Sequence, residues 1–239
     1  MSKLRSALAI AAMMLVSTEI YAQQVTLSGR VKLVATEKQT ETQHSGGVVV
    51  WLTPLDSHAP MKPFHTGPLK LVQHNKSFEP HLLVVPVGAV VEFPNRDPFF
   101  HNVFSLFEGK RFDLGLYEAG SSRYVGFDRP GVSYIFCNIH AEMSAVVIAL
   151  DSPYYSISSA KGEVVIPDVP VGKYLMHIWY ETALPETLKT LTRDINVTEG
   201  TSTLGILQVP AEHLASAHKN KYGMDYEPPA PDSPGYNNP

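Results

Sequence analysis

Short segments rich in Val, Ile, Phe and Tyr, separated by Gly, Pro, Asn and Asp, follow one another along the chain after residue 22. We find no convincing helical period among them. Short strands bounded by turn residues are typical of an all-β sandwich. We predict thirteen strands, at residues 25–34, 47–53, 69–73, 82–87, 89–93, 102–107, 121–127, 132–137, 144–150, 163–166, 173–180, 192–197 and 202–208.

The overall composition excludes several classes of protein. Apolar residues make up 44 % and charged residues 18 % of the chain, which indicates a globular protein rather than a disordered one. The net charge of −4 argues against a nucleic-acid partner, which would require a basic face. Cys137 is the only cysteine, so an internal disulfide, a four-cysteine zinc site and a cysteine-held iron–sulfur cluster are all excluded.

Residues 1–22 have the pattern of a secretory signal peptide. Lys3 and Arg5 give a basic start, and Leu8 to Val16 is an apolar run too short to span a bilayer. Cleavage is expected near Ala22. We therefore predict an exported protein whose mature chain has no membrane span.

The sequence Cys137-Asn-Ile-His140-Ala-Glu-Met143 places three metal-binding side chains in one tight loop between two predicted strands. A thiolate, an imidazole and a thioether are soft donors that favour copper over harder ions. A trigonal site of two histidines and a cysteine with a weak axial methionine needs a second histidine. His101, in the loop before the strand at 102–107, is the candidate. Taken singly, each of these residues would be interpreted as an ordinary core or loop residue. Their order and spacing together favour a metal site.

A histidine followed by Asn-Val, 36 residues before a Cys-x2-His-x2-Met loop, resembles the cupredoxin family. The stretch from Phe78 to Leu150 resembles the plastocyanin-like and amicyanin-like proteins of the methylamine-utilisation type. The resemblance implies one copper ion, with His101, Cys137 and His140 as equatorial ligands and Met143 as the axial ligand. It also implies that Asn95 ties the two ligand loops together by hydrogen bonds. The prolines that relatives such as amicyanin carry in the ligand loop are absent here.

The flanks of this stretch resemble a different family, the carboxypeptidase regulatory-like (transthyretin-like) β-sandwich. The residues that carry the likeness are Gly29-Arg-Val31, Gly47-Val-Val-Val50, Gly162 and the turn from Pro170 to Tyr174. The resulting prediction is an all-β chain in which a cupredoxin Greek-key sandwich is inserted in, or packed on, a second Ig/transthyretin-like sandwich. The predicted parts are a signal peptide (1–22), the flanking sandwich (23–61 plus 152–210), the cupredoxin domain (62–151) and an extended, largely disordered tail (211–239). A linear arrangement, with 23–60 as an extra hairpin on the middle domain, is the alternative.

These features predict a type 1 (blue) copper protein that carries single electrons between redox proteins such as a cytochrome or a dehydrogenase. Export and the resemblance indicate the periplasm of a Gram-negative bacterium. Four protein ligands leave no open position on the metal, and the chain has no Gly-rich phosphate loop, HExxH or GxSxG motif, so we do not expect an enzyme. The alternatives are a copper store, a carbohydrate- or protein-binding module, or a subunit that docks on a membrane redox complex.

His140 is expected near the surface, where it would pass the electron, and Phe99 and Phe100 could form an apolar docking patch beside it. The remaining histidines lack a partnered spacing. His177 is expected to be a packed or solvated strand residue. His213 and His218, near the C-terminus, are weak candidates for metal contact.

Overall fold

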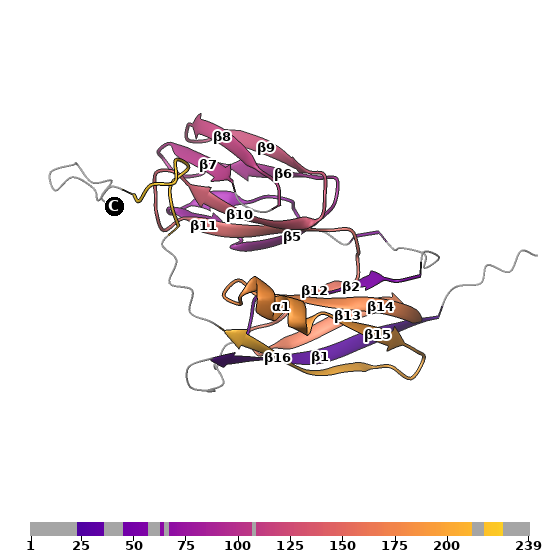
Figure 1. Ribbon diagram of the computed structural model, residues 1–239. Helices are drawn as coiled ribbons and strands as arrows, with labels where there is room; N and C mark the ends of the chain where they lie inside the picture. Colours follow the sequence, from indigo (N-terminus) through magenta and orange to yellow (C-terminus); the bar gives the residue numbers. More distant parts are fainter. Residues whose placement is uncertain are drawn as a thin grey trace, which may run out of the picture.

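In the computed structural model, residues 23–35, 45–56, 63–64, 67–106, 109–211 and 218–226 are described. Their secondary structure is β-strand apart from one helix of seven residues, so the prediction of an all-β fold is confirmed. Figure 1 shows two β-sandwiches, one above the other. The signal-peptide prediction falls on residues outside the described ones. No helix among the described residues has the length and apolar character needed to cross a bilayer.

Strands from the two ends of the chain form one of these units, called here the flanking sandwich. One sheet has the order β13-β1-β16, with β1 antiparallel to β13 and parallel to β16. The other has the order β12-β2-β14-β15. The strands are β1 (Gln24–Ala35), β2 (Val49–Pro54), β12 (Tyr155–Ile157), β13 (Glu163–Pro170), β14 (Gly172–Trp179), β15 (Arg193–Val197) and β16 (Thr203–Ala211).

Strands from the middle of the chain form the second unit, the middle sandwich. A five-stranded sheet has the order β5-β11-β10-β7-β8, and it is accompanied by the pairs β6-β9 and β3-β4. The boundary predicted between residues 61 and 62 lies outside the described residues, and the division into domains stays a prediction. The strands are β3 (Val72–His74), β4 (Ser77–Glu79), β5 (Leu82–Pro86), β6 (Ala89–Pro94), β7 (His101–Ser105), β8 (Phe112–Tyr117), β9 (Ser122–Phe127), β10 (Gly131–Cys137) and β11 (Ser144–Leu150).

Strand β11 carries apolar side chains on both of its faces. Its odd-numbered residues, from Ala145 to Ala149, belong to the core of the middle sandwich. Its even-numbered residues from Val146 to Leu150 belong to a separate cluster that includes Val49 and Trp179 of the flanking sandwich. Full burial of a Val or Leu side chain contributes about 1.5–3 kcal/mol. The continuous apolar run of β11 therefore both completes one core and joins the two sandwiches.

The structure differs from the predicted elements at five places. Two of them are the three-residue strands β4 and β12, which were not predicted. Helix α1 (Pro185–Leu191) follows β14, and its two turns, begun at a proline, are too short to show a helical period. Strand β8 was not predicted because Gly115, at φ +65°, interrupts its apolar pattern. Within the predicted C-terminal tail, residues 218–226 are not extended: they form a turn in which the N–H of Gly223 donates to the carbonyl of Asn220 at 2.9 Å.

Candidate metal centre

The candidate ligands meet at one end of the middle sandwich because β7 and β10 are antiparallel neighbours. Strand β7 begins at His101 and β10 ends at Cys137, and in an antiparallel pair such positions lie side by side. Cys137 pairs with Val103 in the ladder. Just beyond it, the backbone N–H of Asn138 donates to the carbonyl of Asn102 at 2.9 Å, which joins the two loops directly.

Two histidine nitrogens face the sulfur of Cys137. The Nδ1 atoms of His101 and His140 lie 3.6 Å and 3.7 Å from Sγ. One ligand atom from each of the three residues lies within 4.8 Å of the others. Bonds of about 2.0–2.3 Å from one ion to nitrogen and sulfur, meeting at about 120°, would separate those donor atoms by about 3.7 Å. The three side chains therefore fit a single metal ion, and a trigonal set of two imidazoles and a thiolate is the one that blue-copper centres use.

Met143 closes the loop that holds two of these ligands. Its side chain is fully buried and belongs to the same core cluster as Cys137. Its N–H donates to the carbonyl of His140 at 3.1 Å, and its carbonyl accepts from the N–H of Cys137 at 3.2 Å. The N–H of Ile139 donates to Sγ at 3.4 Å. The loop thus combines a thiol, an imidazole and a buried thioether, which is the soft donor set that copper prefers.

Burial keeps the three facing groups uncharged in the metal-free protein at neutral pH. It raises the pKa of the Cys137 thiol, although neighbouring backbone N–H groups oppose the shift. It lowers the pKa of His101. Burial, followed by the nearby His101, also lowers the pKa of His140. A metal ion that binds here consequently displaces the thiol proton, so its apparent affinity rises with pH.

Asp97 is a residue of this centre that the sequence did not single out. Its carboxylate, 3 % exposed, accepts a hydrogen bond from Nε2 of His101 at 2.8 Å. In the tautomer whose Nε2–H donates this bond to Asp97, the His101 ring presents the Nδ1 lone pair toward Cys137. Ligation through Nδ1 requires this tautomer. The only available signal was a carboxylate four residues before the candidate histidine, which by itself is too common to assign.

The Asp97 carboxylate is also fixed from the opposite side, by the turn between β3 and β4. It accepts the N–H groups of Asn75 at 2.6 Å and Lys76 at 3.0 Å. Burial would raise the pKa of Asp97, but the hydrogen bonds from Lys76, His101 and Asn75 outweigh it and the pKa is lowered. Asp97 therefore remains ionised and holds His101 through a charge-assisted hydrogen bond.

Asn95 has a different role from the one that the resemblance implied. Its side-chain amide donates to the carbonyls of Phe99 at 2.7 Å and Tyr117 at 3.5 Å, and its oxygen accepts the N–H of Asp97 at 3.0 Å. Among the described residues these bonds order the loop before His101 and join it to the end of β8. None of them reaches the loop of Cys137. Asn95 thus shapes one ligand loop, and the Asn138–Asn102 bond joins the two.

The edge of the centre at His140 is partly exposed and lined by apolar side chains. The Phe99 ring lies 5.3 Å from the His101 ring and 5.5 Å from the His140 ring, between centroids. Phe100 and Ile139, each beside a candidate ligand in the sequence, are 51 % and 44 % exposed. This side of the site therefore presents hydrophobic surface next to a candidate ligand.

The remaining described histidines lie outside the candidate ligand cluster. His177 stacks on Trp51 with ring centroids 4.8 Å apart, and its Nε2 lies 3.2 Å from the Thr53 hydroxyl. His218 stacks on Phe136. Nδ1 of His74 lies 3.8 Å from Oε1 of Glu79, and Nε2 of His81 lies 2.6 Å from Oε2 of Glu181. The histidines at positions 44, 58, 65 and 213 lie outside the described residues.

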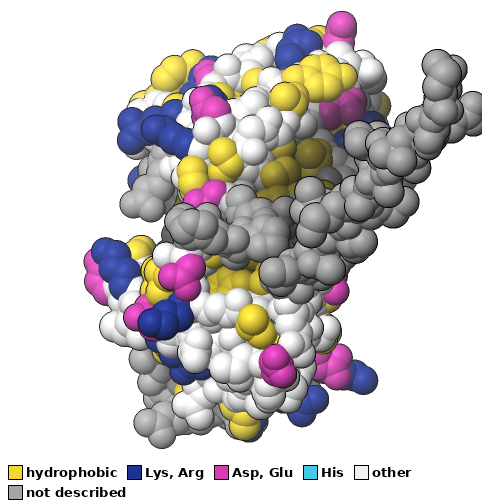
Figure 2. All heavy atoms as spheres, turned by 90° about the vertical axis from the view of Figure 1, so that its right-hand side faces the viewer, with side chains coloured by type: hydrophobic (Ala, Val, Ile, Leu, Met, Phe, Trp, Pro, Cys, Tyr) yellow, Lys and Arg dark blue, Asp and Glu magenta, His cyan; other side chains and the backbone are white. Residues whose placement is uncertain are grey.

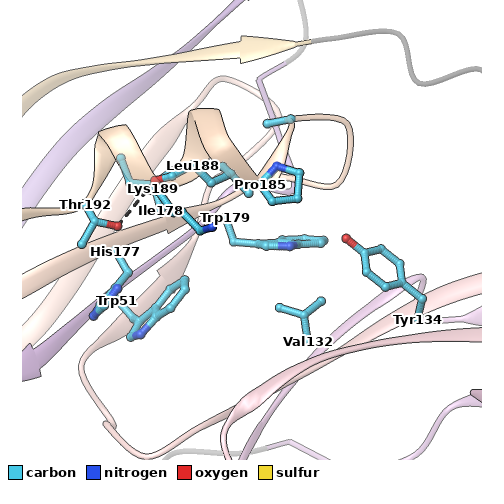
Figure 3. Close-up of a pocket in the computed structure, with 11 residues that line it drawn as sticks. Trp51, Val132, Tyr134, His177, Ile178, Trp179, Pro185, Leu188, Lys189 and Thr192 are labelled. Carbon is cyan, nitrogen blue, oxygen red and sulfur yellow. Dashed lines mark hydrogen bonds between the residues drawn. The ribbon is translucent and has the colours of Figure 1, made fainter. Parts of the chain in front are cut away.

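A cleft of about 220 Å³ lies where the two sandwiches meet, and its walls include Trp51 and Trp179 of the flanking sandwich and Val132 and Tyr134 of β10. Figure 3 shows Tyr134 pointing across the cleft toward Trp179, with the turn that begins α1 above them. On the face shown in Figure 2, basic and acidic side chains are interspersed, without a continuous field of one sign.

No protein-family model and no curated protein matches the chain. Several solved structures resemble part of it. A novel purple cupredoxin from Nitrosopumilus maritimus is 22 % identical, covers 34 % of this chain and 98 % of its own, and has a TM-score of 0.31. The P94A mutant of amicyanin is 21 % identical over 35 % of this chain and 83 % of its own, with a TM-score of 0.33.

A copper-containing nitrite reductase (NirK) from Thermus scotoductus SA-01 is 25 % identical over 41 % of this chain, with a TM-score of 0.33, and the match spans a quarter of its length. These likenesses are partial and their scores are low. The candidate centre therefore rests on its own geometry, and the likeness of the flanks to a regulatory-like sandwich stays a prediction.

Proposed function

We propose that this chain is an exported type 1 copper protein that carries single electrons between redox proteins. The observation that carries the proposal is the convergence of two Nδ1 atoms on the Cys137 sulfur, at 3.6 Å and 3.7 Å, with Met143 buried in the same loop. When bound, a copper ion would supply a one-electron Cu(I)/Cu(II) couple. His101, Cys137 and His140 would hold it through their imidazole and thiolate groups, and Met143 would add its thioether.

The arrangement favours electron transfer over substrate chemistry. Four protein ligands leave no open position, whereas catalytic metals keep one. A buried cysteine and a His101 held through Asp97 give a rigid ligand set, which keeps reorganisation small when the charge of the site changes. We therefore infer a carrier and not an enzyme.

The His140 edge supplies the surface for partners in this proposal. Phe100 and Ile139 are exposed there, and weak redox partners form small interfaces. A cytochrome or a dehydrogenase would dock on this patch, with His140 as the nearest candidate ligand. The signal-peptide pattern of residues 1–22 supports a periplasmic location, where such partners would be met.

The optical and EPR spectra of residues 23–239 loaded with Cu(II) test the metal site. We expect an intense blue thiolate-to-copper band with narrow copper hyperfine splitting, lost in Cys137→Ser. His177→Ala is the matched control, because His177 stacks on Trp51 away from the candidate ligands. A colourless, weakly bound copper would refute the carrier and leave Cys137 a buried thiol.

The second candidate is a copper store or an interaction module, and the aromatic cleft between the sandwiches favours the module. Trp, Tyr and His rings at a cleft are surfaces on which sugars or protein side chains pack. The electron self-exchange rate of the copper-loaded protein separates the two. Fast exchange supports the carrier, and a blue centre with very slow exchange supports the store or module.

A further inference from the structure

The C-terminal segment of residues 218–226 lies against the end of β10 that carries Cys137. In Figure 1 it is the yellow trace beside the middle sandwich, far along the chain from the strands that it touches. The segment closes its own turn: the Asn220 side-chain oxygen accepts the N–H groups of Tyr222 at 3.0 Å and Met224 at 3.1 Å. A side-chain ion pair between Lys219 and Asp225 adds to it.

This segment contacts three consecutive residues at the candidate thiolate. The ring of His218 stacks on Phe136, with centroids 4.1 Å apart and an interplanar angle of 28°. The hydroxyl of Tyr226 donates to the carbonyl of Cys137 at 2.6 Å.

Beyond the thiolate, the N–H of Lys221 donates to the side-chain oxygen of Asn138 at 2.9 Å. The three contacts hold different groups of the strand end: the ring of Phe136, the main-chain carbonyl of Cys137 and the side chain of Asn138.

An ion pair ties the same segment to the other ligand loop. Nζ of Lys221 lies 2.9 Å from Oδ2 of Asp113 on β8, and Oδ1 of that carboxylate accepts from the Asn102 amide at 2.7 Å. The Lys221 side chain is only 21 % exposed. Asn102 follows His101 and accepts the N–H of Asn138. The segment is thus linked to the residues that follow both candidate ligands.

We infer that residues 218–226 form a clasp that holds the Cys137 loop in place, with Tyr226 as a positioning residue of the metal centre. A buried carbonyl that accepts a phenol hydroxyl cannot rotate without losing that bond, so the clasp fixes the peptide that carries the thiolate. The clasp also covers Phe136, which is 9 % exposed, and leaves the His140 edge as the open side of the centre. The role toward copper rests on the proposed function, whereas the clasp itself is a property of the metal-free chain.

Amide hydrogen exchange of the exported protein in a chelating buffer, followed by NMR, tests the clasp without any metal. Tyr226→Phe keeps the ring beside His218 and removes the hydroxyl, and with it the bond to the Cys137 carbonyl and the 3.4 Å contact with Nδ1 of His218. Loss of one hydrogen bond corresponds to an exchange increase of about two- to tenfold, which we expect at Asn138 and Lys221. Truncation after residue 217 should raise Asn138 exchange further. Tyr124→Phe, which removes an exposed hydroxyl on β9, should change neither amide.

Unchanged exchange at both amides in Tyr226→Phe would overturn the clasp, whatever the truncated chain does. A second readout uses Cu(II): Tyr226→Phe should shift the thiolate-to-copper absorption maximum and speed copper loss to a chelator, and Tyr124→Phe should not. A wild-type protein with no such band would refute the proposed copper function while leaving the exchange result standing. A normal band in every variant, with faster exchange in Tyr226→Phe, would keep the clasp and remove its role toward the metal.

Discussion

Replacing Asp97 with Asn preserves the size of the side chain but leaves it unable to satisfy its three donors. The carboxylate accepts the N–H of Asn75 on Oδ1, and the N–H of Lys76 and Nε2 of His101 on Oδ2. An amide has one acceptor oxygen and one NH₂ group. Whichever way the amide is turned, its NH₂ faces a backbone N–H in a position that is 3 % exposed.

Two losses follow from this mismatch. One buried N–H without an acceptor costs about 1–3 kcal/mol, so the free energy of unfolding of the metal-free protein should fall by about that amount. With the amide nitrogen toward His101, Nε2 has to accept and the ring proton moves to Nδ1, which faces Cys137. Loss of such a supporting carboxylate weakens metal affinity by about 10–100-fold, and we expect Cu(II) affinity to fall in this range.

Urea denaturation in a chelating buffer measures the first loss, and competition with a chelator of known affinity measures the second. Asp128→Asn is the control, because Asp128 is 68 % exposed and its pair with Lys110 is a surface salt bridge worth at most about 1 kcal/mol. If Asp97→Asn matched Asp128→Asn in both the unfolding free energy and the copper affinity, the assigned role of Asp97 would be wrong.

Three further predictions address the axial ligand, the joint between the sandwiches and pH. Met143→Ala should keep the thiolate-to-copper band and shift the reduction potential, measured by voltammetry, because the axial ligand tunes the potential; an unshifted potential would contradict its axial role. Trp179→Ala should lower the free energy of unfolding by about 3–5 kcal/mol in a denaturant titration, since this side chain is 5 % exposed in the cluster between the sandwiches, and an unchanged midpoint would argue against that joint. The pKa of His81 is raised, first by its hydrogen bond to Glu181 across the same joint. Its stabilisation is therefore full below the unfolded pKa of 6.5 and is lost as pH rises through the raised folded pKa. Since the pair is about half exposed, wild type should lose less than about 1 kcal/mol between pH 6 and pH 9, and His81→Gln should lack this loss; equal slopes would show that the pair does not contribute.

The class of fold could be predicted from local patterns because strands leave a residue-by-residue signature. In β13, Val164 and Ile166 are buried and Val165 between them is exposed, the alternation that a half-buried strand requires. Helix α1 left no comparable signal, since two turns contain too few residues for a period of 3.6. Strand β8 was missed for the related reason that a glycine with positive φ breaks its alternation.

The loop sequence was enough to predict which side chains could form a soft metal site, because Cys137, His140 and Met143 share one loop and need no distant contact to meet. How that site is completed depends on contacts between remote parts of the fold. The direction of the His101 Nδ1 atom depends on the register of β7 against β10, and its tautomer depends on Asp97, which the β3–β4 turn holds in place. The hold on the Cys137 carbonyl comes from Tyr226, 89 residues further along the chain. Contacts of this kind are set by strand register and by packing between remote segments, and no local spacing encodes them.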